Sequence, residues 1–262
     1  MIPVLAEIDY ANFGIRWVHI VAGVAWIGML WFFNWVNGPF AKTMDAETKR
    51  KVVPELMPRA LWWFRWGAAF TWLTGFFMLF LLYYHGDYGY AIDGGGKPEF
   101  IEWMGPFAGL FVGFLLYDLM MKTLGKSQEL VAMVIWGVLA VGFACVLAEI
   151  WNHSQRSSLV HIGALFGTAM AANVWMRIWP AQKRIITAVK NGEAPNGDDV
   201  ANATMRSRHN TYMSVPLLLL MLSVHDIGQF SANYAYYATA VIAVGWLGCF
   251  GCYKMAGNVK GF

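Results

Sequence analysis

The chain has 262 residues, of which 58% are hydrophobic and only 13% are charged, and its formal net charge is +3. Soluble globular domains carry about 25% charged residues, so this composition excludes that class and indicates an integral membrane protein. A net charge this small does not produce the electrostatic footprint of a nucleic-acid-binding protein. We therefore expect no nucleic acid among its partners.

Seven stretches are apolar and long enough, or nearly so, to cross a hydrocarbon core of roughly 30 Å as helices. In chain order they lie near 13–37, 61–84, 105–121, 130–150, 159–179, 210–225 and 234–253. The sixth is short in apolar residues, so we expect its helix to begin in water at Asp199, with Asp198 as the N-cap. The sequence therefore predicts an all-α fold, a single bundle of about seven transmembrane helices over residues 1–262.

Lysine and arginine are distributed unevenly among the segments that join these spans. Sixteen of the nineteen basic residues lie in alternate segments, 38–65, 122–129, 177–209 and 254–262. The segments between these contain only Arg16, Lys97 and Arg156. Because basic residues near helix ends are retained on the cytoplasmic side, we expect the N-terminus outside and the C-terminus in the cytoplasm. No basic n-region precedes the first span, so we expect that span to be kept as structure.

Three of the predicted spans carry a histidine near the same, outer end, namely His19, His161 and His225. Imidazoles from different helices at one depth can hold a haem between those helices. Small residues follow His19 and His161 and leave room for a flat macrocycle, although close helix packing explains them equally well. We predict one haem b, with His19 and His161 as axial ligands of the iron and His225 as a third imidazole nearby. Arg16, one turn outward from His19, suits a haem propionate or, equally, is an interfacial arginine that reaches toward water.

The other histidines have different expected roles. His85 and His153 lie at the outer ends of the second and fourth spans, where an amphipathic ring is comfortable without any function. His209 is on the cytoplasmic side, sixteen residues or about 24 Å from His225, so these two cannot ligate one iron. His209 is instead a candidate ligand of a second haem.

Four segments are long or unusual enough to carry a resemblance to a known family: WVHIVAGVAWIG at 17–28, WFRWGAAFTWLTGF at 63–76, HIGALFGTAMAANVWMRIWPAQ at 161–182 and RSRHNTYMSVPLLLLMLSVH at 206–225. Over nearly its whole length the chain resembles the membrane-embedded N-terminal region of the bacterial membrane-bound urate oxidases, the cytochrome-linked urate hydroxylases. The resemblance implies a helical bundle in the bacterial inner membrane that handles electrons and contains b-type haem. It also implies oxidation of urate at C5, with electrons passing to a c-type haem in an attached periplasmic domain.

The chain departs from that family's pattern at several places. It has no Cys-x-x-Cys-His motif for a c-type haem, and we interpret Cys249 and Cys252 as small buried residues. The sequence stops after the seventh span, so we expect the cytochrome domain and its anchoring helix to be missing together. The resemblance also implies a histidine-bearing stretch after the first span and a glutamate early in the second, where this chain has Gly38 and Gly67. If those polar groups handle urate, this chain has lost them.

A second polar group lies at the cytoplasmic ends of the spans and consists of Arg65, Asp118, Arg177 and His209. Ionisable residues at membrane depth usually pair with one another or mark a functional path. The simplest prediction is a structural ion pair between Arg65 and Asp118. Alternatively, the basic side chains neutralise an anion, either the propionates of a second haem or a urate-like substrate.

These observations lead to three functional hypotheses. The first is a membrane cytochrome whose bis-histidine haem b exchanges electrons with a periplasmic cytochrome c or a larger respiratory complex. The second is a urate-oxidase-like hydroxylase that relies on a separate cytochrome partner. The third is a haem-free structural subunit of a membrane complex. In each case the Trp- and Phe-rich surface is expected to contact membrane lipid, and the sequence is compatible with a homo-oligomer.

Overall fold

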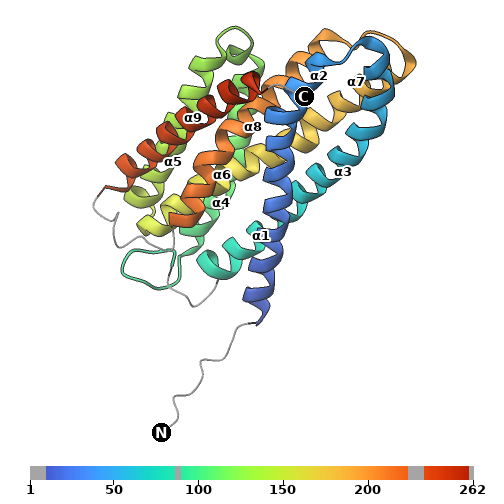
Figure 1. Ribbon diagram of the computed structural model, residues 1–262. Helices are drawn as coiled ribbons and strands as arrows, with labels where there is room; N and C mark the ends of the chain where they lie inside the picture. The colour runs from blue at the N-terminus through green and yellow to red at the C-terminus, as the bar shows by residue number, and fades with distance from the viewer. Residues whose placement is uncertain (1–9, 86–89, 224–232, 260–262) are drawn as a thin grey trace.

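The computed structural model describes residues 10–85, 90–223 and 233–259. Within these ranges the helices are α1 (Tyr10–Trp31), η1 (Phe32–Asn37), α2 (Gly38–Thr43), α3 (Ala46–Leu79), η2 (Phe80–Tyr84), α4 (Phe100–Lys122), η3 (Leu124–Lys126), α5 (Glu129–Ile150), α6 (Gln155–Asn173), η4 (Val174–Ile178), α7 (Trp179–Asn191), α8 (Gly197–Ser223) and α9 (Tyr234–Asn258). The described residues form no sheet, only one isolated bridge between Ile92 and His153. Figure 1 shows the long helices side by side in one bundle.

Six continuous helical segments are long and apolar enough to cross a membrane. They are Tyr10–Thr43, Ala46–Tyr84, Phe100–Lys122, Glu129–Ile150, Gln155–Asn191 and Tyr234–Asn258. They contain six of the seven predicted spans, which confirms an all-helical, multi-pass membrane fold. The remaining predicted span, 210–225, is described up to residue 223, where it forms the second half of α8. This helix is not among the six in the described part of the chain, consistent with its shortage of apolar residues.

Local capping explains where several helices begin and end. The carboxylate of Asp45 accepts from the backbone N–H of Thr48 at 2.7 Å and caps α3, and Glu99 and Glu102 form a capping box at the start of α4. Gly192 ends α7 at a φ of 77°, a left-handed conformation that only glycine adopts without strain.

The predicted start of α8 is nearly right, but its predicted cap is wrong. The side chain of Asn196, not Asp198, accepts from the backbone N–H groups of Asp198 and Asp199, at 2.8 and 3.3 Å. Asparagine and aspartate are equally good N-caps, so sequence alone does not distinguish between neighbouring candidates.

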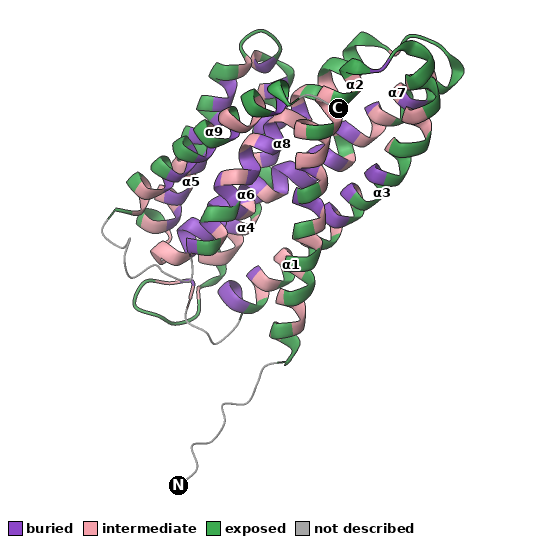
Figure 2. Ribbon diagram, viewed as in Figure 1, coloured by how far each residue is buried: buried purple, intermediate pink, exposed green. Residues whose placement is uncertain are grey.

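The core is built around α6. Of the apolar stretch in Gln155–Asn191, 72% is buried, compared with 17% of the stretch in Tyr10–Thr43. α6 packs against α8, α4 and α5, whereas α1 packs mainly along α3 at the edge of the bundle. Figure 2 shows this contrast between the buried central helices and the exposed outer face of α1. Side chains on α6 are therefore the ones best shielded from lipid and water.

The two ends of the bundle differ in charge. One end is formed by α2, α7 and the segments 123–128 and 192–196, and we call it the basic end because nearly all lysines and arginines lie toward it. The opposite end is formed by segments 90–99 and 151–154. This separation is what a membrane protein with all its basic loops on one side is expected to have.

Three of the spans contain a π-helical turn, namely η1, η2 and η4. Such turns are rare and occur frequently at functional sites, because the extra residue turns the following side chains to a new direction. Each of the three lies beside a cavity or a buried polar group.

Candidate functional site

A buried hydrogen-bond chain joins α6 to η2 at the opposite end of the bundle. Nε2 of His161 lies 2.7 Å from the hydroxyl oxygen of Tyr84, and Nδ1 lies 2.7 Å from the carbonyl oxygen of Ser157. A carbonyl oxygen only accepts, so Nδ1 carries the proton and Nε2 accepts from the Tyr84 hydroxyl. His161 is fully buried. It is therefore a neutral imidazole with both ring nitrogens engaged by the protein.

His153 extends this chain from the turn between α5 and α6. Its Nε2 donates to the carbonyl oxygen of Glu102 at 2.6 Å, and its Nδ1 accepts from the hydroxyl of Ser157 at 2.7 Å. The ring is only 2% exposed, lies edge-on to His161 at 5.4 Å, and burial lowers its pKa. His153 thus lies at the end of the bundle, as expected, but as a buried and hydrogen-bonded ring and not as an exposed interfacial one. The bridge to Ile92 folds this turn inward, and no local sequence signal predicts it.

His19 lies on α1 against α3. Its Nδ1 is 3.1 Å from the hydroxyl oxygen of Thr74, and a Cβ on Gly75 would lie 3.0 Å from its Cε1. Thr74 and Tyr84, the partner of His161, are ten residues apart on one continuous helix, or roughly 15 Å. The two histidines thus contact Ala46–Tyr84 at different levels.

The predicted haem site between His19 and His161 does not fit these contacts. An imidazole binds a metal through a ring nitrogen with a free lone pair, but Nε2 of His161 already accepts from Tyr84 and Nδ1 is protonated. The space beside Gly163 is filled too, because a Cβ there would lie 2.6 Å from Cε of Met221. Haem ligation at His161 therefore stays a prediction that requires this side chain to leave Tyr84.

The other predicted haem contacts are only partly described. His225 lies outside the described residues, so its role as a third imidazole stays a prediction. The Nε of Arg16, the expected propionate partner, donates to the side chain of Asn12 at 2.9 Å, one turn away on α1. His85 is exposed and lies edge-on to Trp103 at 5.0 Å, as expected for an interfacial ring.

The predicted ion pair between Arg65 and Asp118 is wrong. The carboxylate of Asp118 pairs instead with Lys122, Arg177 and Arg206. The guanidinium of Arg65 lies over the ring of Trp179, 4.1 Å from its centroid, in a cation–π contact. Several cations lie at the right depth to meet this carboxylate, and only the rotation of the helices about their axes selects among them.

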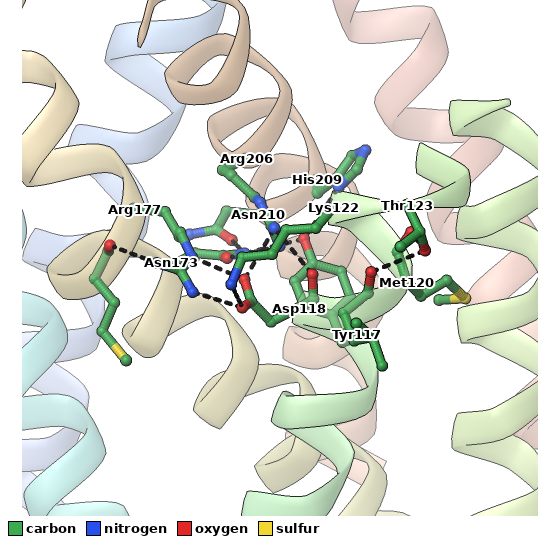
Figure 3. A network of polar contacts seen from close by, with 12 residues as sticks. Tyr117, Asp118, Met120, Lys122, Thr123, Asn173, Arg177, Arg206, His209 and Asn210 are labelled. Carbon is green, nitrogen blue, oxygen red and sulfur yellow. Dashed lines mark hydrogen bonds and ion pairs between the residues drawn. The ribbon is translucent and has the colours of Figure 1, made fainter. Parts of the chain in front are cut away.

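His209 belongs to a second buried hydrogen-bond chain, at the basic end. Its Nε2 donates to the carboxylate of Glu129 at 2.9 Å, so its Nδ1 accepts from the hydroxyl of Tyr117 at 3.0 Å. The Tyr117 oxygen also accepts from Nδ2 of Asn173 at 3.0 Å. Figure 3 shows Tyr117, Asn173 and His209 beside Asp118. Because both nitrogens of His209 are engaged and its ring is buried, the second haem does not fit here either.

A cavity of about 500 Å³ lies at the basic end among η1, α2, α3, α7, α8 and α9. One part of its lining is aromatic and aliphatic, including Phe33 and Phe64. The polar part includes Asn37, Lys42, Gln182, Ser207 and Arg208. The cavity therefore offers flat apolar contact, several hydrogen-bonding groups and positive charge to one small molecule.

The described residues contain no group of three or more His, Cys, Asp or Glu side chains with metal-ligating geometry. Sequence reasoning missed Tyr84 and Tyr117, which engage the buried rings of His161 and His209. Both stand in apolar, aromatic-rich runs, where a tyrosine usually belongs to the interfacial belt. A π-helical turn directs Tyr84 inward, and single-sequence patterns do not predict such turns.

Comparison with known proteins places this bundle in a family. Residues 6–51 and 44–250 match the family model described as urate oxidase N-terminal. The chain belongs to this family. No curated protein matches the chain, and neither does any solved structure. The family match confirms the resemblance drawn from the four sequence segments, and it covers nearly all of the helices described above.

The residues at which this chain departs from the expected family pattern lie in different structural environments. Gly38 lines the basic-end cavity. Gly67 lies at the contact between α3 and α1, where a Cβ would be 3.1 Å from the backbone nitrogen of Trp26. A glutamate at position 67 would therefore require α1 and α3 to separate. Cys249 is buried and Cys252 half-buried, both as free thiols.

Proposed function

We propose that this chain is the membrane-embedded part of an oxidoreductase of the urate oxidase type. It binds a small anionic heterocycle such as urate in the basic-end cavity and passes electrons to a separate carrier. Membership of the urate oxidase N-terminal family, over residues 6–51 and 44–250, is the observation that carries this proposal.

The chemistry of the cavity supports the same assignment. Its volume of about 500 Å³ is within the range of roughly 300–1,000 Å³ that small-molecule pockets occupy. Urate is a planar anion with hydrogen-bonding groups around its edge. Lys42 supplies positive charge for it, Asn37 and Gln182 supply amide groups, and Phe33 supplies an apolar surface. Arg208 also lines the cavity, but its guanidinium pairs with the carboxylate of Glu129.

The proposal also includes the orientation of the bundle across the membrane and the identity of the electron acceptor. With the basic end in the cytoplasm of a bacterium, the substrate enters from the cytoplasmic side of the inner membrane. The acceptor is a periplasmic cytochrome c or a larger respiratory complex. Because both ring nitrogens of His161 and of His209 are engaged within the protein, no electron-transfer step is assigned to either histidine.

Binding of urate to the purified full-length chain tests the proposal directly. We expect saturable binding of radiolabelled urate in equilibrium dialysis, weakened several-fold by Lys42→Gln. Lys190→Gln removes the same charge from an exposed lysine at the same end that does not line the cavity, and should leave binding unchanged. Absence of saturable binding would contradict the proposal and favour a structural subunit. Equal effects of the two substitutions would place the binding outside this cavity.

A further inference from the structure

The carboxylate of Asp118 is saturated by donors from three helical segments. Oδ1 accepts from Nε of Arg177 at 2.8 Å and from a terminal nitrogen of Arg206 at 2.9 Å. Oδ2 accepts from Arg177 at 2.5 Å and from Nζ of Lys122 at 2.7 Å. Figure 3 shows the three cationic side chains converging on this one acid. The four lone-pair positions of the carboxylate are therefore all occupied.

The group formed by Asp118, Lys122, Arg177 and Arg206 has more positive than negative charge. Three cations share one carboxylate, which leaves a net charge of +2. The nearby Glu129 does not compensate, because Arg208 and His209 engage its oxygens. Unbalanced charge at the edge of a hydrocarbon layer is costly, so this site favours a second anion.

Donor groups are in excess as well as charge. Nε of Arg206 is buried and has no hydrogen-bond partner in the described part of the chain, although the side chain is only 1% exposed. Apart from the bond to the Asp118 carboxylate, the terminal nitrogens of Arg206 make long contacts, at 3.4 Å with Oδ1 of Asn173 and at 3.3 Å with the carbonyl oxygen of Asp118. Buried arginine nitrogens nearly always have hydrogen-bond partners. The unpartnered Nε of Arg206 therefore indicates that an acceptor is missing from the group around Asp118.

The accessible part of the site lies where a span ends. Lys122 is the last residue of α4, and its side chain is 51% exposed. Arg177, on η4, is 25% exposed, and both side chains contact the same oxygen of Asp118, so they lie next to each other. Lipid headgroups lie at this level of a membrane protein, and basic pockets between helices are typical sites for their phosphates.

We propose that Lys122 and Arg177, supported by Arg206 from behind, form a binding site for the phosphodiester of an anionic phospholipid. Asp118 already engages the planar fork of Arg177, so Arg177 offers the phosphate its charge and its remaining terminal N–H groups. Lys122 adds a compact charge beside it. The anion offsets the excess positive charge that Asp118 leaves unbalanced. The lipid thereby holds the end of α4 against η4. This site is independent of the cavity assigned above to a small heterocycle.

Lipid retention by the full-length chain tests this site. In phosphatidylcholine vesicles to which phosphatidylglycerol is added, native mass spectrometry after extraction should show a bound phosphatidylglycerol. Lys122→Gln should weaken its apparent affinity by roughly fivefold, as the loss of one near-surface cation predicts, and Lys122→Arg should restore it. Lys126→Gln is the matched control, because it removes an exposed lysine one turn further along that has no contact with Asp118.

Two results would overturn the proposal. If Lys122→Gln and Lys126→Gln weaken retention equally, only the general surface potential attracts the lipid. If inorganic phosphate displaces the lipid at similar concentration and raises the thermal unfolding midpoint as much, the site binds free phosphate and not a lipid headgroup. The side chain of Lys122 is half exposed, so its replacement by glutamine should leave the bundle folded, and the thermal unfolding midpoint of Lys122→Gln checks this.

Discussion

The hydroxyl of Tyr84 donates to Nε2 of His161 at 2.7 Å in the interior of the bundle. Since Nδ1 of the same ring donates to Ser157, both nitrogens are used without any cofactor. A histidine that in the sequence resembles a haem ligand is thus part of the polar core that joins η2 to α6. Because of this hydrogen bond, His161 has no free ring nitrogen for the iron of the predicted haem.

Tyr84→Phe should destabilise the bundle by about 1–3 kcal/mol, because it leaves Nε2 of a buried imidazole without a donor. The measurement is the shift of the thermal unfolding midpoint in detergent. Tyr236→Phe, at a tyrosine that is 77% exposed, should change the midpoint little. Equal midpoints for wild type and Tyr84→Phe would show that this hydrogen bond is not maintained in solution.

The visible absorption spectrum of the purified protein should not depend on His161, because its ring nitrogens are engaged by Tyr84 and Ser157. We expect wild type and His161→Ala to have the same absorbance in the Soret region. A Soret band that is present in wild type and lost in His161→Ala would contradict this. Loss in His19→Ala as well would then restore the bis-histidine haem b of the first hypothesis.

Asp118→Asn should be strongly destabilising, by about 3–5 kcal/mol, because it removes the carboxylate that holds Lys122, Arg177 and the buried Arg206 together. Asp199→Asn is the matched control. Asp199 makes a similar two-pronged pair with Arg184, but in water, where screening makes the pair weak. Thermal unfolding of both variants at one ionic strength measures the difference, and comparable losses would mean that Asp118 is not buried.

Gly67→Ala should cost about 1–3 kcal/mol, because the new methyl group would lie 3.1 Å from the backbone of Trp26 and would push α1 away from α3. Gly28→Ala, on α1, meets nothing within 4 Å and should be neutral or stabilising by up to about 1 kcal/mol through helix propensity. Thermal unfolding of the two single variants separates these effects. A neutral Gly67→Ala would show that α1 is loosely held.

Stability should fall as the pH is lowered below about 6.5, the pKa of an unfolded histidine. Burial lowers the pKa of His153, so below pH 6.5 the unfolded chain takes up a proton that the folded chain does not bind. This contribution is fully present above pH 6.5 and is lost progressively as the pH decreases. Unfolding midpoints over this range should depend less on pH in His153→Gln. An unchanged pH dependence would show that His153 is not the group responsible.

The sequence by itself determined six of the seven predicted helical spans, where basic residues gather and which family the chain belongs to. These are local properties, since hydropathy, length and charge between spans do not depend on neighbouring helices. The resembling segment 161–182 was recognised in the same way. The start of α3 at Ala46, fifteen residues before the predicted span, was not.

Only the tertiary structure decided which polar side chains meet. Arg65 and Arg206 lie at comparable depth, yet Arg206 contacts Asp118 and Arg65 lies on Trp179, because each helix is rotated so that one cation faces the core. A π-helical turn directs Tyr84 inward to His161. Helix rotation depends on packing over the whole bundle, and a one-residue change of register exchanges a lipid-facing side chain for a buried one. The partners of the histidines therefore could not be predicted from spacing alone.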